Sequence, residues 1–275
     1  MNPRPSTSRP ARLPSVWTTT CAFAVYLFLY APLAMVVMQS FNAARHGGRW
    51  EGFTTAWYKA LPHNAAAWEA CRNTLVLASA STAIATVLGT LLAYGLSRAR
   101  FPGHRLLERG LSLQIFLPDI LLAAALLLAL SVVGTWWPAV QPGLTAMIAA
   151  HVTFQLPFVA LVVRARLARL DPALEEAARD LGASGWRLFR SITLPLLRPG
   201  ILAGALLAFT LSLDDFVVSY FTTGPGATTL PIWIYASAKR GLSPEVHAFS
   251  TLLILASVIL TLALNLTHKK PWTPD

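Results

Sequence analysis

The sequence predicts an all-α, polytopic membrane protein with six transmembrane helices. Its composition is the first reason: 55% of the 275 residues are hydrophobic and 12% are charged, which is too apolar for a soluble globular domain. The second reason is that the apolar residues form six runs long enough to cross a bilayer. The third is that arginines and lysines flank these runs, so the formal net charge of +10 indicates a membrane protein rather than a nucleic-acid-binding one.

The first three predicted helices cover residues 16–40, 74–97 and 111–133. The first run is uncharged over 25 residues, longer than the roughly 7–15 residues of a signal-peptide core. The second is uncharged over 24 residues and carries a small side chain at every fourth position, which favours close helix packing. These small residues are Ala85, Gly89, Ala93 and Ser97. The third run is interrupted by Gln114 and by Pro118-Asp119.

The last three predicted helices cover residues 143–163, 199–221 and 248–267. The fourth contains His151, and the fifth contains Asp214-Asp215, inside otherwise apolar sequence. The sixth is followed by a basic cluster, His268, Lys269 and Lys270, which is typical of a stop at the cytoplasmic face.

The positive charges predict which loops face the cytoplasm. Of the 22 lysines and arginines, 16 lie in one set of segments and 6 in the other. The positive-inside rule assigns the richer set to the cytoplasm. These cytoplasmic segments are the tail 1–15, the connection 98–109, the loop 164–198 and the tail 268–275. The predicted external loops are 41–72, 134–142 and 222–247.

The loop 164–198 contains a predicted helical hairpin. Asp171 can cap a helix with Pro172 at its first position, and Gly182 fits the left-handed turn that ends it. Glu175 and Arg179 stand four apart on the side predicted to be exposed, while the apolar face is formed by Leu174, Ala177, Ala178 and Leu181.

A second short helix is predicted to start at Ser184 and to end at Pro195 and Pro199, before the next membrane segment. Such a hairpin can rest on lipid headgroups or dock a soluble partner, and the pattern alone leaves both readings open.

The same loop resembles a known family, the permease subunits of binding-protein-dependent ABC importers. Their cytoplasmic loop carries E-A-A, three residues, G, nine residues and then I-x-L-P. The matching residues here are Glu176, Ala177, Ala178, Gly182, Ile192, Leu194 and Pro195. The resemblance implies that the loop forms a coupling helix in a cleft of the ATP-hydrolysing subunit, with Glu176 as its polar contact and Gly182 as its turn.

Further motifs resemble the spermidine/putrescine permeases of the type I importer class, most of all the second permease of a putrescine-type system. These motifs are the opening Tyr30-Ala31-Pro32-Leu33, residues 211–218, residues 223–231 and residues 241–245. The resemblance implies the type I importer permease fold in a bacterial inner membrane. It also implies three partners: a periplasmic polyamine-binding protein, a second permease and a pair of ATPase subunits. Putrescine and spermidine both stay open as substrates.

The chain is not expected to be an enzyme. A Walker-type phosphate loop is absent, so ATP and magnesium would bind the partner ATPase, and this chain needs no cofactor. A membrane-embedded hydrolase is disfavoured because His-Glu-x-x-His is absent and the adjacent Asp214 and Asp215 would point about 100° apart on a helix. Cys21 and Cys71 suggest neither a disulfide nor a metal site. The nearer alternative is an importer of sulfate, molybdate, iron or thiamine.

Acidic residues inside the apolar runs are candidates for the substrate pathway. An aspartate at the centre of a membrane helix costs roughly 2.5–3.5 kcal/mol, so Asp119, Asp214 and Asp215 should not face lipid. Asp119, ten residues past Arg109, is predicted about 15 Å into a bilayer core about 30 Å thick, near its midplane. Asp215 could instead hydrogen-bond a neighbouring helix. Carboxylates together with aromatic rings would suit an organic diamine, and the candidate aromatics are Tyr220, Trp233 and Tyr235.

Overall fold

The computed structural model describes residues 16–45, 49–99, 101–137, 140–241 and 243–267. Within these residues, six helical stretches are long and apolar enough to cross a membrane, as predicted. They are Val16–Gln39, Ala65–Arg98, Asp119–Trp136, Leu144–Leu167, Gly185–Leu213 and Pro244–Ala263. The predicted tails 1–15 and 268–275 lie entirely outside the described residues. The chain divides into two compact units, Asn64–Ala236 and the remainder.

The smaller unit is built on two long helices, α1 (Val16–Gln39) and α12 (Pro244–Thr267), which pack against each other. The short helices α2 (Ala56–Ala60) and η1 (Leu61–His63) also contact α12. The buried Asn42 organises the segment after α1, because its side-chain amide donates to the carbonyl of Arg49 and its Oδ1 accepts from the N–H of Glu51, at 2.8 and 3.0 Å. The Asn42 side chain therefore connects the end of α1 to residues 49 and 51 of the predicted loop 41–72.

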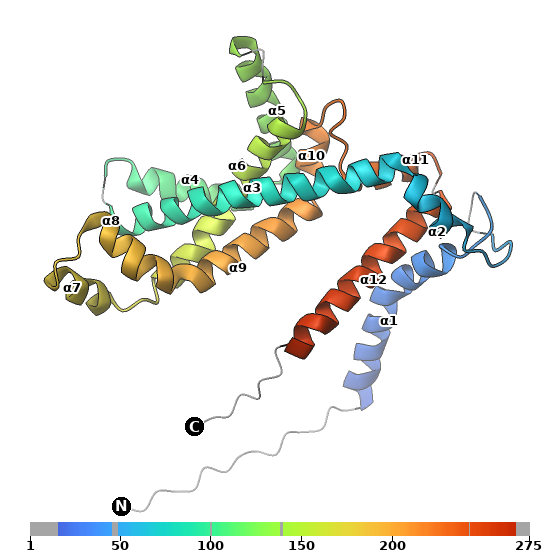
Figure 1. Ribbon diagram of the computed structural model, residues 1–275, viewed down its shortest axis with the longest axis horizontal. Helices are drawn as coiled ribbons and strands as arrows, with labels where there is room; N and C mark the ends of the chain where they lie inside the picture. The colour runs from blue at the N-terminus through green and yellow to red at the C-terminus, as the bar shows by residue number, and fades with distance from the viewer. Residues whose placement is uncertain (1–15, 46–48, 100, 138–139, 242, 268–275) are drawn as a thin grey trace, which may run out of the picture. The chain divides into compact units, whose positions relative to one another are not determined.

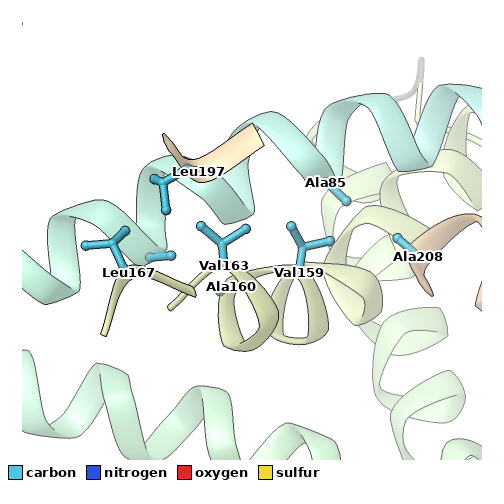
Figure 2. Close-up of a cluster of buried hydrophobic side chains, with 8 residues drawn as sticks. Ala85, Val159, Ala160, Val163, Leu167, Leu197 and Ala208 are labelled. Carbon is cyan, nitrogen blue, oxygen red and sulfur yellow. The ribbon is translucent and has the colours of Figure 1, made fainter. Parts of the chain in front are cut away.

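The larger unit has a core of three mutually packed helices: α3 (Ala65–Arg98), α6 (Leu144–Leu167) and α9 (Leu194–Leu213) (Figure 1). The predicted small face of α3 is confirmed, since Ala85, Gly89 and Ala93 are buried. A similar small face on α9 is also buried and consists of Gly200, Gly204, Ala208 and Ser212. Figure 2 shows Val163 of α6 and Leu197 of α9 pointing toward one another in this core. Small side chains let the backbones approach closely where branched side chains fill the space between them.

The Gly89→Ala variant is expected to destabilise this core by about 1–3 kcal/mol. A Cβ at position 89 would lie 2.8 Å from Cβ of Val159 and 3.2 Å from the carbonyl oxygen of Leu156. Gly95→Ala is the matched control on the same helix, because a Cβ there meets no atom within 4 Å. Thermal unfolding of the detergent-purified protein should show a lower midpoint for Gly89→Ala alone. Equal unfolding midpoints for the two variants would show that a Cβ at position 89 is accommodated without loss of stability.

Helices α3, α6 and α12 extend beyond their predicted ends, so the segments that adjoin them are shorter than expected. Helix α3 begins at Ala65, where the side chain of Asn64 accepts from the N–H of Ala67 at 3.0 Å. Helix α12 begins at Pro244, and α6 continues to Leu167. The predicted ends of these helices, Thr74, Ala248 and Val163, therefore differ from the observed ones.

The third predicted helix is two helices, α4 (His104–Phe116) and α5 (Asp119–Trp136). Pro118 lacks an N–H and forces the preceding Leu117 into an extended conformation, with ψ of 135°. Asp119 is the first residue of α5 and does not lie inside one continuous helix, as the predicted run 111–133 implied. Helix α4 is tied to α6 by Arg164, which contacts Glu108 at 2.6 Å. This hydrogen bond lowers the pKa of the Glu108 carboxyl below its ordinary value.

The fifth predicted helix differs at both ends. The helical stretch Gly185–Leu213 is continuous and consists of α8 (Gly185–Leu188), the π-helical turn η2 (Phe189–Thr193) and α9. The prediction that Pro195 and Pro199 end the hairpin is wrong. Pro195 lies where η2 joins α9, inside the continuous stretch, and Arg166 of α6 donates to the carbonyl of Leu196 next to it, at 3.4 Å.

At its other end, α9 stops at Leu213, and the chain resumes as α10 (Val217–Thr222). Asp214 and Asp215 thus lie in a break between two helices and not inside one. The segment after α10 returns to α3, because Asn73 donates its side-chain N–H to the carbonyl of Gly226 at 2.9 Å. Helix α11 (Leu230–Lys239) follows, matching the apolar stretch of the sequence.

Candidate functional site

The hairpin of the loop 164–198 starts with α7 (Pro172–Asp180), and its capping is as predicted. Oδ1 of Asp171 accepts from the N–H of Ala173 at 2.9 Å, and Pro172 is the first helical residue. Gly182 has a φ of +84°, and the carbonyls of Arg179 and Ala178 accept from the N–H groups of residues 182 and 183. This pair of bonds is a Schellman motif, which needs a left-handed residue at position 182. Ser184 precedes α8 but makes no side-chain capping bond.

The two glutamates of α7 have opposite environments. The prediction that Glu175 lies on the exposed side is wrong, because Glu175 is 5% exposed. Its carboxylate pairs with Arg98 of α3 at 2.6 Å and with Arg179 at 3.3 Å. Glu176, one residue and about 100° further round the helix, is exposed. The glutamate of the family motif is therefore the one free to meet a partner.

The hairpin exposes apolar side chains that the described residues of this chain do not cover. Leu174 is 49% exposed, Leu181 is 90% exposed and Trp186 is 67% exposed. Of the other motif residues, Ala177 and Gly182 are exposed and Ala178 is buried. Ile192, Leu194 and Pro195 are half-buried at the start of the following helix. An exposed apolar surface of this kind, next to a free carboxylate, fits a protein or lipid contact.

A second site lies at the break between α9 and α10. Asp119, Asp214 and Asp215 all line one cavity of about 340 Å³. The remaining lining residues are apolar or aromatic and come from α5, α6, α9, α10 and the break. They are Leu122, Phe154, Phe158, Leu211, Phe216, Val217 and Val218. The structure thus brings together the three acidic residues that the sequence singled out.

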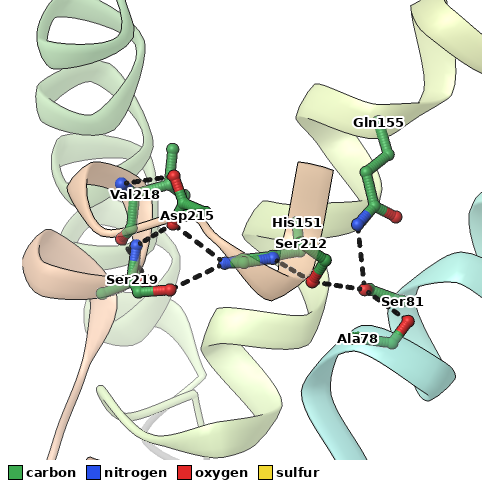
Figure 3. Close-up of polar contacts among 9 residues, drawn as sticks. Ala78, Ser81, His151, Gln155, Ser212, Asp215, Val218 and Ser219 are labelled. Atoms are coloured by element: carbon green, nitrogen blue, oxygen red, sulfur yellow. Dashed lines mark hydrogen bonds and ion pairs between the residues drawn. The ribbon is translucent and has the colours of Figure 1, made fainter. Parts of the chain in front are cut away.

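The three aspartates differ in their partners. Asp119 and Asp214 are exposed. The side chain of Asp215 is 12% exposed and caps α10, where it accepts from the N–H groups of Val218 and Ser219 at 3.3 and 2.8 Å. Its Oδ2 also lies 3.4 Å from Nε2 of His151 on α6 (Figure 3). The alternative weighed from the sequence, that Asp215 hydrogen-bonds a neighbouring helix, is confirmed.

His151 is the centre of a buried polar network that joins four helices (Figure 3). The imidazole is fully buried, with Nδ1 at 2.8 Å from Oγ of Ser212 and Nε2 at 3.1 Å from Oγ of Ser219. Ser212 lies 3.4 Å from Ser81 of α3, which accepts from Nε2 of Gln155 at 3.1 Å. A proton on Nε2 of His151 satisfies the neighbouring carboxylate and leaves Nδ1 to accept from Ser212. The network holds the broken helix against α6 and α3.

The three predicted aromatic residues do not share one role. Phe216 lines the cavity and contacts the rings of Tyr220 and Tyr235, with centroids 5.3 and 4.7 Å apart. Trp233 is 8% exposed, so the prediction that its ring lines an open path is not supported by this structure.

Sequence reasoning missed several residues of both sites. Phe154, Phe158 and Phe216 line the cavity, and Glu175 anchors the hairpin. Phenylalanines in membrane segments carry no distinguishing signal. His151 did carry one, because an ionisable residue inside an apolar run is costly unless it is paired.

Comparison with known proteins identifies the class of protein. Residues 85–269 match the family described as binding-protein-dependent transport system inner membrane component. This chain belongs to that family, whose members are multi-pass inner-membrane subunits of transporters and not enzymes.

Several of the most similar individual relatives are spermidine/putrescine or putrescine permeases. The chain is 41% identical to the spermidine/putrescine transport system permease protein PotC of Escherichia coli (strain K12), over 88% of this chain and 90% of the relative. It is 40% identical to the putrescine transport system permease protein PotI of the same organism, over 87% and 86%. PotC of Haemophilus influenzae is 39% identical, over 90% and 95%. The resemblance to spermidine/putrescine permeases is confirmed, and these identities do not separate the two kinds of system.

Solved structures confirm the fold. A chain of a bacterial ABC transporter involved in the import of the acidic polysaccharide alginate superposes with a TM-score of 0.69 at 17% identity, over 96% of this chain and all of the other. The same kind of transporter, in complex with an alginate pentasaccharide-bound periplasmic protein, gives a TM-score of 0.72 at 20% identity, over 94% and 96%. These identities support the importer permease fold alone.

Proposed function

We propose that this chain is the permease subunit of an ATP-driven importer of polyamines, either putrescine or spermidine. One observation carries the substrate assignment: Asp119 and Asp214, both exposed, line the same cavity as three phenylalanines. A protonated amine pairs with a carboxylate, and its charge is also attracted to the face of an aromatic ring within about 6 Å. The named activity of the PotC and PotI relatives supports the same substrate class.

The fold by itself does not select the substrate. The structural relatives with this fold belong to a transporter of an acidic polysaccharide. The same fold therefore accommodates substrates of different charge, and the substrate must be inferred from the residues that line the cavity. Carboxylates at the cavity would repel sulfate or molybdate, which disfavours these alternatives.

Energy for transport would come from other subunits. The proposed assembly contains a second permease, a pair of ATPase subunits that bind ATP and magnesium, and a periplasmic polyamine-binding protein. The exposed residues Leu174, Glu176 and Leu181 of the hairpin are proposed to dock on the ATPase. Movement of the docked hairpin would then shift the membrane helices as rigid bodies between inward-open and outward-open states.

Calorimetry on the purified binding protein encoded beside this chain tests the substrate class. Putrescine or spermidine should bind, and sulfate, molybdate, iron and thiamine should not. Uptake of the same polyamine by proteoliposomes that contain the complete transporter should depend on this chain. Binding of an anion without binding of either polyamine would refute the proposal.

The proposed topology places both termini and the hairpin in the cytoplasm. It can be tested by cysteine labelling in a variant whose native residues Cys21 and Cys71 are replaced, since both are free thiols. Gly185 has a φ of +46° and would be strained by a side chain, so the exposed Arg187 is a better labelling position. Arg187→Cys should react only after the membrane is permeabilised, whereas Glu51→Cys should react in intact spheroplasts. Labelling of residue 187 from outside intact cells would show that the hairpin faces outward and would contradict the proposed topology.

A further inference from the structure

A buried carboxylate joins the hairpin to two membrane-spanning stretches. The side chain of Glu175 on α7 is 7% exposed and has partners on three elements. Oε1 accepts from Arg98 in the last turn of α3 at 2.6 Å and from Thr193 at the end of η2 at 3.2 Å. Oε2 accepts from Arg179 one turn further along α7 at 3.3 Å. Both oxygens are therefore held, and one of them connects three segments that are far apart in the sequence.

Few other groups attach α7 to the rest of the chain. Of its nine residues, only Glu175 and Ala178 are buried. Ala178 contributes a methyl group, whereas Glu175 contributes directed, charge-assisted hydrogen bonds. The position of α7 relative to α3 and η2 consequently depends on the Glu175 carboxylate more than on apolar packing.

The energetics make this contact sensitive to geometry. Removing a carboxylate from water costs several kcal/mol, and the cost is offset only while its partners stay in place. If α7 moved away from the end of α3, the carboxylate would be left buried without its arginine. The end of α3 and the start of α9 are thus favoured to follow α7 when it moves.

We propose that Glu175 is a positioning residue for energy coupling. Its carboxylate passes the movement of the docked hairpin to α3 through Arg98 and to α9 through Thr193. This inference rests on the proposed transport function. It assigns to Glu175 a role distinct from that of Glu176, which faces outward to the ATPase.

The test measures polyamine transported per ATP hydrolysed by the complete transporter in proteoliposomes, with the binding protein and either putrescine or spermidine supplied. Glu175→Gln is expected to lower this ratio about fivefold or more while the subunits still assemble. Arg98→Gln should lower it by a similar factor. The double variant should fall no further than either single one, because both changes remove the same contact.

Asp180→Asn is the matched control, since Asp180 is an exposed carboxylate on the same helix. Its ratio should equal that of the unaltered chain. If Glu175→Gln prevents assembly, Arg98→Gln decides the question, because the Arg98 side chain is 35% exposed and its loss leaves the core intact. An unchanged ratio in Arg98→Gln, or single effects that multiply in the double variant, would overturn the inference. An unaltered transporter that moves no polyamine would overturn the proposed function instead.

Discussion

Replacing Glu176 with lysine, or Gly182 with aspartate, is expected to reduce substrate-stimulated ATP hydrolysis to about a tenth or less of its normal rate. Lysine at 176 reverses the exposed charge offered to the ATPase. Aspartate at 182 places a negative charge at the carboxyl end of α7, where the helix dipole is already negative. Both altered chains should still reach the membrane and assemble, because neither position is buried. ATPase assays on reconstituted complexes measure the effect.

Two controls separate docking from general disturbance of the hairpin. Gly182→Asn should keep most of the activity, because asparagine tolerates the left-handed conformation and brings no charge. Asp180→Lys reverses an exposed charge on the same helix outside the motif and should have little effect. Near-normal transport in both Glu176→Lys and Gly182→Asp would refute the docking role and favour a hairpin that rests on lipid.

Asp119→Asn and Asp214→Asn are each expected to lower polyamine uptake about tenfold, which corresponds to the loss of one charge-assisted contact of about 1.4 kcal/mol or more. Both carboxylates line the cavity and are exposed, so their removal should leave the fold intact. Initial uptake rates at several polyamine concentrations should show a raised KM.

Asp215→Asn provides the contrast within the same cavity. Its carboxylate accepts two backbone N–H groups and contacts the buried His151. This variant should therefore lose about 1–3 kcal/mol of stability and assemble poorly. Unchanged uptake in both Asp119→Asn and Asp214→Asn would reject an acidic lining by this chain, and uptake lost only together with assembly would show a structural role.

Features governed by local rules could be predicted from the sequence. The cap at Asp171, the turn at Gly182 and the small face around Gly89 follow from backbone conformation and side-chain size within a few residues. The motif with Glu176 could also be found from the sequence, because all its residues lie in one short segment with defined spacing. These features place the hairpin and the helix core correctly.

Features governed by contacts between helices could not be predicted. The side of α7 that is buried depends on Arg98 and Thr193, which lie 77 and 18 residues away from Glu175 in the sequence. The break after Leu213 depends on a carboxylate that caps α10 and on His151 of α6. Pro195 gave a misleading signal, because the π-helical turn before it lets the helix continue through the first turn of α9.

The helical stretch Gly185–Leu213 connects the hairpin to the acidic cavity without interruption. Its 29 residues begin at the hairpin and end beside Asp214, and the π-helical turn η2 and Pro195 lie within them. Gly200 of α9 lies against Arg166 of α6, because a Cβ there would be 2.7 Å from that side chain. The part of α9 from Gly200 to Leu213 is about 20 Å long. A tilt of α9 by about 10° at the contact with Arg166 would move its end beside Asp214 by roughly 3 Å, which would open or narrow the acidic cavity without any helix unfolding.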